Sequence, residues 1–153
     1  MSINKLIPLS QLKKKIFFYK KNKVKICFTN GCFDILHSGH IKLLINSKKK
    51  NHKLIVAVNS DSSYFKNKKK KPRFSFNERV KILSQIVSVD YIVKQSNENP
   101  ISLIRLIKPN FHCKGGDYNA KDLKEYNLLK KIKTKIFIMP IKGNKISSSK
   151  IIL

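Results

Sequence analysis

Hydrophobic positions along the chain fall into two kinds of block, which alternate. Short continuous apolar runs, such as ICF at 26–28 and LIVAV at 54–58, are typical of strands buried on both faces of a sheet. Between them lie longer amphipathic segments whose apolar residues are three or four apart, as in helices that cover a sheet. This alternation predicts an α/β fold with a doubly wound, Rossmann-like parallel sheet. Five strands are expected: Val24–Thr29, Leu54–Asn59, Tyr91–Val93, Phe111–Cys113 and Ile136–Met139.

The helices are expected in the intervals between these strands. Ser10 can cap a first helix, with Leu12, Ile16, Phe17 and Tyr19 at roughly helical spacing. Residues 60–75, which include four consecutive lysines, are expected to form a loop. A second helix is predicted from Ser38 to the Lys48–Lys50 triplet, and a third begins at Phe76 and places Val80, Leu83 and Val87 on one face. The remaining helices are predicted from Pro100 through ISLIRLI, over Lys121–Ile132, and at the terminal SSSKIIL.

The length and composition indicate one globular domain. The chain has 153 residues, of which 41% are hydrophobic, and no repeat or Gly/Ser/Pro-rich linker divides it. We therefore predict a single domain over 1–153, with 1–22 as an N-terminal helical extension. The absence of a membrane-length apolar run and of a signal peptide, together with only three cysteines, leads us to expect a cytoplasmic protein without a membrane partner.

The net charge of +26 first suggests a polyanionic partner such as a nucleic acid. However, 31 of the 34 basic residues are lysines, whereas modules that read nucleic-acid sequence favour the bidentate fork of arginine. Lys, Ile and Asn together make up 66 of the 153 residues, and all three have AT-rich codons. Genome composition therefore accounts for much of the charge, and a nucleic-acid partner is not the favoured interpretation.

The segment FTNGCFDILHSGH, which follows the first expected strand, carries the candidate chemistry. Its His37 and His40 are three residues apart at the start of a helix, so both imidazoles can face one spot. The unpaired N–H groups of a helix N-terminus attract anions at the same place. The pair thus indicates a phosphate site, with two surface histidines beside a helix cap as the alternative.

Two other kinds of site fit this segment less well. A zinc site would need further ligands, for which Cys32 or Asp34 could serve, but the common helical zinc motif spaces its histidines four apart. The G-x-G-x-x-G fingerprint of dinucleotide-binding folds is absent after the strand.

NGCFDILHSGH, placed between a strand and a helix, resembles the H-x-G-H motif of the nucleotidyltransferase superfamily. The segments IVAVNSDSSYFK, RFSFNERVKIL, VDYIV, PNFHCKGGDY and ISSSKII follow in the order found in its small sugar-phosphate members. Among these, KGGDY is most similar to the bacterial heptose 1-phosphate adenylyltransferases, whereas glycerol-3-phosphate cytidylyltransferases tend to have a GDDW-like segment. The resemblance covers residue 24 to the C-terminus.

This resemblance implies direct attack of a substrate phosphate oxygen on the α-phosphate of a nucleoside triphosphate, with pyrophosphate leaving. His37 and His40 would stabilise the transition state, and one lysine of the Lys68–Lys71 block, taken here as Lys69, would close over the phosphates. A place for Asp34 in the sugar-phosphate pocket is implied, and bracing of the loop is an equally good interpretation. Arg79 is implied to reach the substrate or the triphosphate, and the alternative is an arginine on the solvated face of its helix. The nucleotide would be bound by Asn30, Gly31, Cys32, Phe33, Lys114, Gly115, Ser147, Ser148 and Ser149, and the second substrate by Asp34, Asn59, Asp61 and Arg79.

The family resemblance also implies the partners of the reaction. We expect ATP or CTP with Mg²⁺, a sugar phosphate, no protein-bound metal, and a homodimer. The leading prediction is AMP transfer from ATP to a heptose 1-phosphate. The alternatives are a CTP-dependent enzyme of the glycerol-3-phosphate type and, more distantly, a basic nucleic-acid-binding domain without catalysis.

Overall fold

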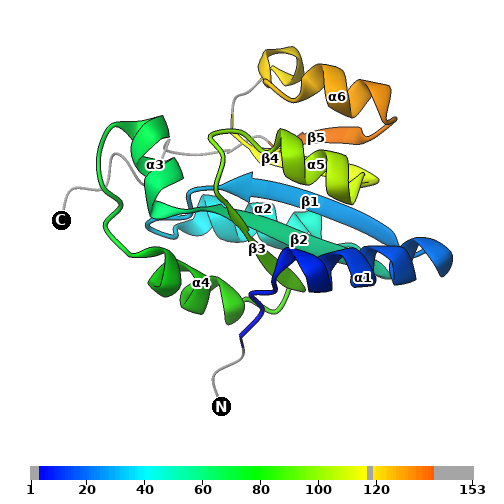
Figure 1. Ribbon diagram of the computed structural model, residues 1–153, viewed down its shortest axis with the longest axis horizontal. Helices are drawn as coiled ribbons and strands as arrows, with labels where there is room; N and C mark the ends of the chain where they lie inside the picture. The colour runs from blue at the N-terminus through cyan, green and yellow to red at the C-terminus, as the bar shows by residue number, and fades with distance from the viewer. Residues whose placement is uncertain (1–3, 117–118, 140–153) are drawn as a thin grey trace.

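Five parallel strands form one sheet in the order β3-β2-β1-β4-β5 in a computed structural model, which describes residues 4–116 and 119–139 (Figure 1). The doubly wound, five-stranded parallel sheet expected from the hydrophobic pattern is confirmed. Each strand includes most of its expected segment, with bounds shifted by one or two residues at one or both ends. The strands are β1 (Lys25–Gly31), β2 (His52–Asn59), β3 (Tyr91–Gln95), β4 (Phe111–Gly115) and β5 (Lys135–Met139).

The winding of the sheet reverses at β1, its central strand. The chain adds β2 and β3 on one side of β1 and then crosses to add β4 and β5 on the other. The ladder between β1 and β2 continues to Gly31 and Val58, but the ladder between β1 and β4 ends at Phe28 and His112. The two strands therefore part towards their carboxyl ends. Doubly wound sheets bind ligands at such a reversal point.

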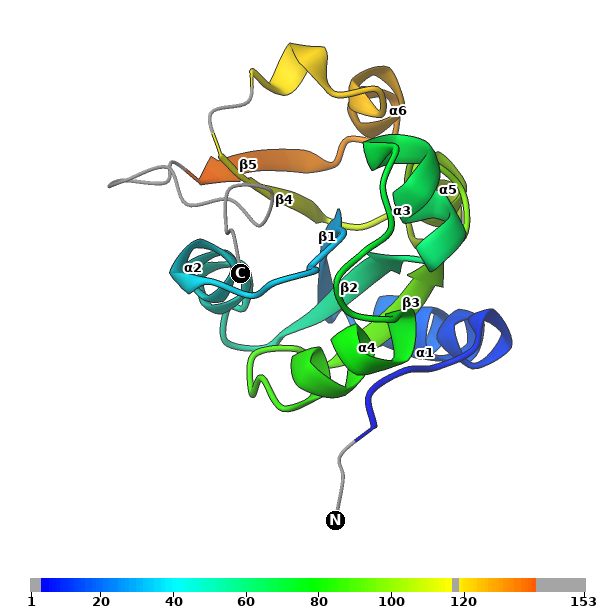
Figure 2. The same ribbon diagram turned by 90° about the vertical axis from the view of Figure 1, so that its left-hand side faces the viewer.

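Helices cover both faces of the sheet (Figure 2). On one face α1, α5 and α6 pack against Phe28 and Ile55, and on the other α2 and α4 pack against Val56. The anchor of α1 is Leu12, which is completely buried among these residues, so the first helix is part of the core. The helices are α1 (Leu9–Lys21), α2 (Ser38–Ser47), α3 (Asp61–Lys68), α4 (Phe76–Ser84), α5 (Ile101–Ile107) and α6 (Tyr126–Lys131), with a short 3₁₀ turn at Ala120–Asp122.

The expected loop over 60–75 is wrong in its first half, which forms α3. Ser60 caps this helix by accepting a hydrogen bond from the N–H of Ser63, and Asp61 lies in its first turn. The helix has no apolar stripe, because its buried positions are only Ser63 and Tyr64. Hydrophobic periodicity could not reveal it, but the Ser-Asp start was a capping signal.

Three other expected helices have different boundaries. The segment Lys121–Ile132 forms a 3₁₀ turn and the separate α6, because Leu123 adopts an extended conformation between them. Helix α4 ends at Ser84, which leaves Val87 95% exposed rather than on the buried face. Helix α1 begins after Pro8 without a cap from Ser10, and its Phe17 is exposed. The helix expected at SSSKIIL lies outside the described residues.

Candidate active site

The first strand delivers the H-x-G-H segment to the carboxyl edge of the sheet. After β1 the chain turns through Asn30–Phe33, and α2 begins with His37 as its N-cap. Nδ1 of His37 accepts a hydrogen bond from the N–H of Gly39 at 3.1 Å. Because Nδ1 is an acceptor, the neutral ring carries its proton on Nε2. The cap therefore leaves His37 with one N–H donor for a ligand at the helix N-terminus.

His40 lies against His37, as the three-residue spacing predicts. The ring centroids are 4.0 Å apart with an angle of 30° between the planes, and the ring of Phe33 packs on His40 from another side at 5.3 Å. Burial lowers the pKa of His37, and burial together with the charge of His37 lowers the pKa of His40 to about 4. Both rings are therefore neutral near pH 7, and they can serve as hydrogen-bond donors rather than as fixed cations.

The turn before α2 is tightly packed. A Cβ on Gly31 would lie 3.2 Å from the ring of Phe33, and Phe33 itself has a positive φ of 48°. The thiol of Cys32 approaches Oδ1 of Asn59 at 3.8 Å, and burial raises the pKa of that thiol. Cys32 is thus a neutral thiol near pH 7 and is not an activated nucleophile.

Arg79 holds this turn to the neighbouring helices. Its side chain is 1% exposed, so the alternative of a solvated helix arginine is wrong. The guanidinium donates to the carbonyl of Cys32 at 2.6 Å and to that of Phe74 at 3.1 Å, and it pairs with Asp61 at 2.7 Å. Arg79 and Asp61 therefore connect α3, α4 and the turn, while their role as substrate ligands stays a prediction.

Asp34 braces the loop between α3 and α4. Its buried carboxylate accepts hydrogen bonds from the hydroxyl of Tyr64 at 3.0 Å and from the backbone N–H groups of Arg73 and Phe74 at 2.9 and 3.0 Å. Burial, together with this hydrogen bond, raises the pKa of Tyr64 to about 12. Of the two roles left open by the sequence, bracing is the one with observed contacts. Asn59 is similarly engaged, with Nδ2 donating to Ser63 at 2.6 Å.

Replacing Asp34 with asparagine tests this bracing role. We expect D34N to lower the free energy of unfolding by about 2 kcal/mol, because three hydrogen bonds lose their charged acceptor. Urea unfolding measures the change, and the exposed Asp122→Asn, which removes the same charge, should leave stability within about 0.5 kcal/mol of wild type. Unchanged stability in D34N with weaker binding of the second substrate would instead show a substrate contact.

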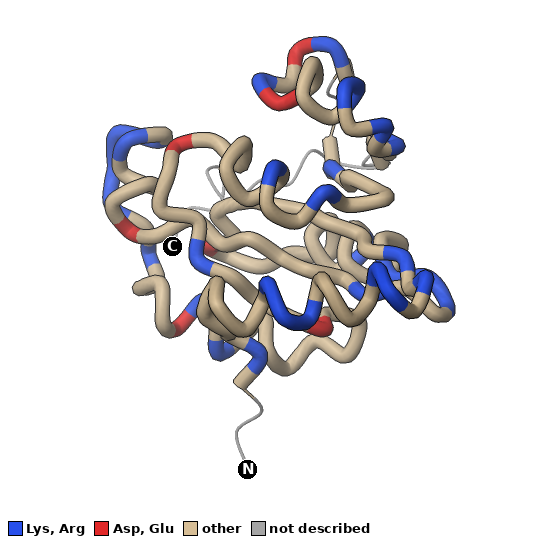
Figure 3. The backbone as a smooth tube through the Cα atoms, turned by 45° about the vertical axis from the view of Figure 1, so that its right-hand side comes forward, with Lys and Arg blue, Asp and Glu red and all other residues tan. Residues whose placement is uncertain are grey.

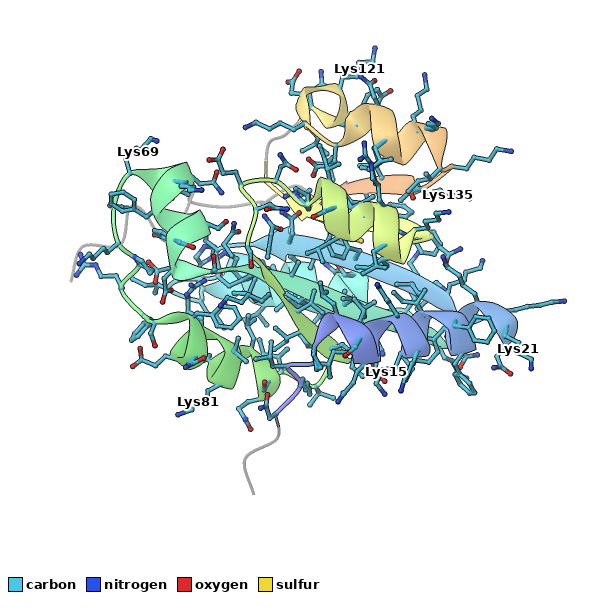
Figure 4. All side chains as sticks on the ribbon, viewed as in Figure 1. Lys15, Lys21, Lys69, Lys81, Lys121 and Lys135 are labelled. Carbon is cyan, nitrogen blue, oxygen red and sulfur yellow. The ribbon has the colours of Figure 1, made fainter. Side chains whose placement is uncertain are left out.

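The remaining candidate residues are spread more widely. Lys114 donates from Nζ to the carbonyl of Asn30 at 3.4 Å, and Gly115 lies against Leu43 of α2, so both are at the parting of β1 and β4. Lys69 ends α3 with a φ of 56° and points away from the body of the molecule (Figure 4). Its predicted catalytic role is untested. Ser147, Ser148 and Ser149 lie outside the described residues.

Sequence reasoning missed two buried groups near the site, His112 and Glu125. Their side chains meet at 3.0 Å between β4 and the start of α6. His112 lies two residues before the KGGDY segment, but no spacing rule in the sequence connects it to Glu125. Only the fold brings the pair together.

The basic residues are not confined to one element of the fold. They occur along α1, along α6 and in the segment after α3 (Figure 3). In the part of the chain that the structure describes, no group of three or more His, Cys, Asp or Glu side chains could hold a metal ion, and no helix is long and apolar enough to cross a membrane.

Comparison with known proteins gives one consistent result. Residues 28–153 match the family model described as cytidylyltransferase-like. The bifunctional protein HldE of Aliarcobacter butzleri is 44% identical over 115 residues, which are 74% of this chain and 24% of that protein. HldE of Desulfatibacillum aliphaticivorans is 37% identical over 149 residues, which are 97% of this chain and 30% of that protein. The chain thus spans less than a third of the length of these relatives.

Two solved structures show the same fold. The lipopolysaccharide core biosynthesis protein from Thermoplasma volcanium superposes with a TM-score of 0.62 at 30% identity, covering 79% of this chain and 98% of that one. Pantoate-beta-alanine ligase from Francisella tularensis, solved in complex with beta-gamma ATP and beta-alanine, has a TM-score of 0.59 at 19% identity, covering 87% of this chain and 66% of that one. The second likeness concerns the fold alone.

Proposed function

The chain belongs to the cytidylyltransferase-like family of nucleotidyltransferases, and from that premise we propose that it transfers AMP from ATP to a sugar 1-phosphate, with a heptose 1-phosphate as the acceptor. The observation that carries the proposal is the His37–His40 pair, with ring centroids 4.0 Å apart, at the N-terminus of α2, beside the point where the sheet reverses. Neutral imidazole N–H groups and helix N–H groups there suit the phosphates of a nucleotide.

The reaction needs no protein nucleophile. An oxygen of the sugar phosphate attacks the α-phosphorus of ATP, a new P–O bond forms, and the bond to the leaving pyrophosphate breaks. Because Nδ1 of His37 is engaged by the helix cap, its Nε2–H would donate to an oxygen of the reacting phosphate as negative charge builds on it. The triphosphate would bring Mg²⁺ into the site, and the ion would supply positive charge to the phosphates as pyrophosphate leaves.

The choice of ATP and heptose rests on the KGGDY segment at residues 114–118 and on the relatives. The HldE proteins match across most of this chain, and the Thermoplasma neighbour is a lipopolysaccharide core biosynthesis protein. Both support a sugar-phosphate acceptor over glycerol 3-phosphate. The basic residues in Figure 3 lie on several separate segments, which does not favour a nucleic-acid interface over a phosphate site.

A substrate panel tests this function. ATP and CTP are each paired with heptose 1-phosphate and with glycerol 3-phosphate, and pyrophosphate release is measured for the four pairs. Release should be fastest with ATP and heptose 1-phosphate. We expect at least about a hundredfold preference in kcat/KM, because specific hydrogen bonds to a base or sugar hydroxyl give discrimination of that order. Exclusive use of CTP would overturn the adenylyl assignment and leave the family intact.

A further inference from the structure

Two adjacent phenylalanines of α1 face away from the core. The helix buries Leu12, Ile16 and Tyr19 in the core on this face of the sheet, and these contacts fix its position in the fold. Phe17 and Phe18 lie outside that buried face and are 74% and 58% exposed. Single exposed apolar side chains are common on protein surfaces, but two adjacent rings form a small apolar patch, which marks a candidate contact surface.

Lysines surround this pair of rings. Residues three and four positions apart are neighbours on the surface of a helix. All four such neighbours of Phe17 are exposed lysines, namely Lys13, Lys14, Lys20 and Lys21. These four lysines, together with Phe17 and Phe18, are called the α1 surface below. It combines a protruding apolar centre with a ring of positive charge.

The positive charge of the α1 surface has no acidic partner in the described part of the chain. The helix contains no Asp or Glu, and the first acidic residue of the sequence is Asp34, after β1. None of the ion pairs among the described residues includes a lysine of α1. Burial lowers the pKa of Lys20, and the like charge of Lys108 lowers it further. The basic segments at α3 and α6 differ, since they include acidic residues such as Asp61 and Asp122.

The α1 surface lies away from the proposed active site. Because α1 ends at Lys21 and β1 begins at Lys25, the end of the helix is at the amino edge of the sheet. The H-x-G-H segment follows β1 and is at the carboxyl edge. Figure 4 shows Lys21 at one end of the molecule and Lys69 at the other. A partner bound to the α1 surface would therefore leave the active site open.

We propose that the α1 surface binds the anionic surface of a lipid bilayer, with the rings of Phe17 and Phe18 inserted among the headgroups and the four lysines beside the lipid phosphates. Rings that project from a helix can enter a bilayer directly, whereas a protein partner would have to supply a matching pocket. The long lysine side chains can lie along the inserted rings while their ammonium groups stay in the headgroup layer. The proposal is independent of the proposed function.

The charge of the α1 surface also argues against a second copy of the chain as its partner. A symmetric dimer through this surface would place lysines against lysines, and such like-charge contacts are unfavourable. The expectation of no membrane partner depended on the absence of a spanning apolar run, which has no bearing on a helix that lies on the surface of a bilayer.

Vesicle sedimentation tests the proposal. The full chain should bind vesicles of equal parts phosphatidylcholine and phosphatidylglycerol but not vesicles of phosphatidylcholine alone, because each lysine near an anionic surface adds to the attraction. Raising the salt to about 0.5 M NaCl should weaken binding at least about tenfold, because the charges are then screened. Binding to both kinds of vesicle alike would overturn the proposal.

Two variants separate the contributions of the rings and the charges. F17S/F18S should bind the anionic vesicles about tenfold more weakly than wild type, since less apolar area leaves water. K13Q/K14Q/K20Q/K21Q should bind at least about a hundredfold more weakly, because four cations are lost. Both sets of positions are exposed, so the melting temperature and pyrophosphate release without vesicles should match wild type.

Lysines of another segment supply the matched control. K121Q/K124Q/K130Q/K131Q removes four exposed lysines at and before α6 and should bind the anionic vesicles within about threefold of wild type, because distant charges are screened. An equal loss in this control would show attraction by the net charge alone and overturn the proposal, as would wild-type binding by F17S/F18S. Binding of single-stranded RNA, or self-association, that F17S/F18S abolishes while wild type binds no vesicles would also overturn it, in favour of that partner.

Discussion

Replacing either His37 or His40, the histidines of the proposed active site, with alanine should lower kcat for pyrophosphate release at least about a hundredfold, in line with the loss of one proposed transition-state donor. Each ring has a different support: His37 is fixed by the N–H of Gly39, and His40 is fixed between His37 and Phe33. H37A removes the donor directly. H40A also removes the ring that packs against His37, so the two losses should not add in the double variant.

His52→Ala is the matched control for these variants. His52 lies at the amino end of β2, at the opposite edge of the sheet from the H-x-G-H segment, where it stacks on Phe111 at 5.2 Å. Its removal should leave kcat within about threefold of wild type, because electrostatic stabilisation requires a donor near the reacting oxygens. Turnover near the wild-type level in both H37A and H40A would contradict the mechanism.

The fold was largely predictable because its strands are buried on both faces. Residues such as Ile55 and Val56 lie in the middle of β2 and are completely buried, and they stand out as a continuous apolar run. Helix α3 was not predictable from periodicity, because a helix stabilised by its Ser60 cap and a few buried residues has no apolar stripe. Local capping and tertiary contacts override the hydrophobic pattern in such short elements.

The site was predictable only where one segment contains the chemistry. His37 and His40 are close in sequence, so helical spacing alone indicates that they meet. Arg79 was singled out only by family resemblance, and its contacts with Cys32 and Phe74 depend on how α4 packs against the turn. The pair of His112 and Glu125, 13 residues apart across an irregular segment, had no signal in the sequence.

Arg79→Met should lower the free energy of unfolding by about 3 kcal/mol, because a buried guanidinium and its two hydrogen bonds to partly buried carbonyl groups are lost while the side-chain volume is nearly kept. These are the carbonyls of Cys32 and Phe74. The contribution of Asp61 is small, since its side chain is 49% exposed and water can solvate it. Urea unfolding gives the magnitude, and Arg105→Met on the exposed face of α5 is the control that should change stability by less than about 0.5 kcal/mol.

The same variant connects stability to function through the turn that Arg79 holds. If the Cys32 carbonyl is released, the residues between β1 and α2 lose the contact that fixes them relative to α4. R79M should then also raise the KM for ATP, whereas Asp34→Asn, which acts on the loop after α3, should change it less. Arg79→Lys keeps the charge without the forked geometry, so its stability should lie between those of R79M and wild type. A loss of under about 1 kcal/mol in R79M would show that water replaces the guanidinium, and that the turn is held by the packing of Phe33 instead.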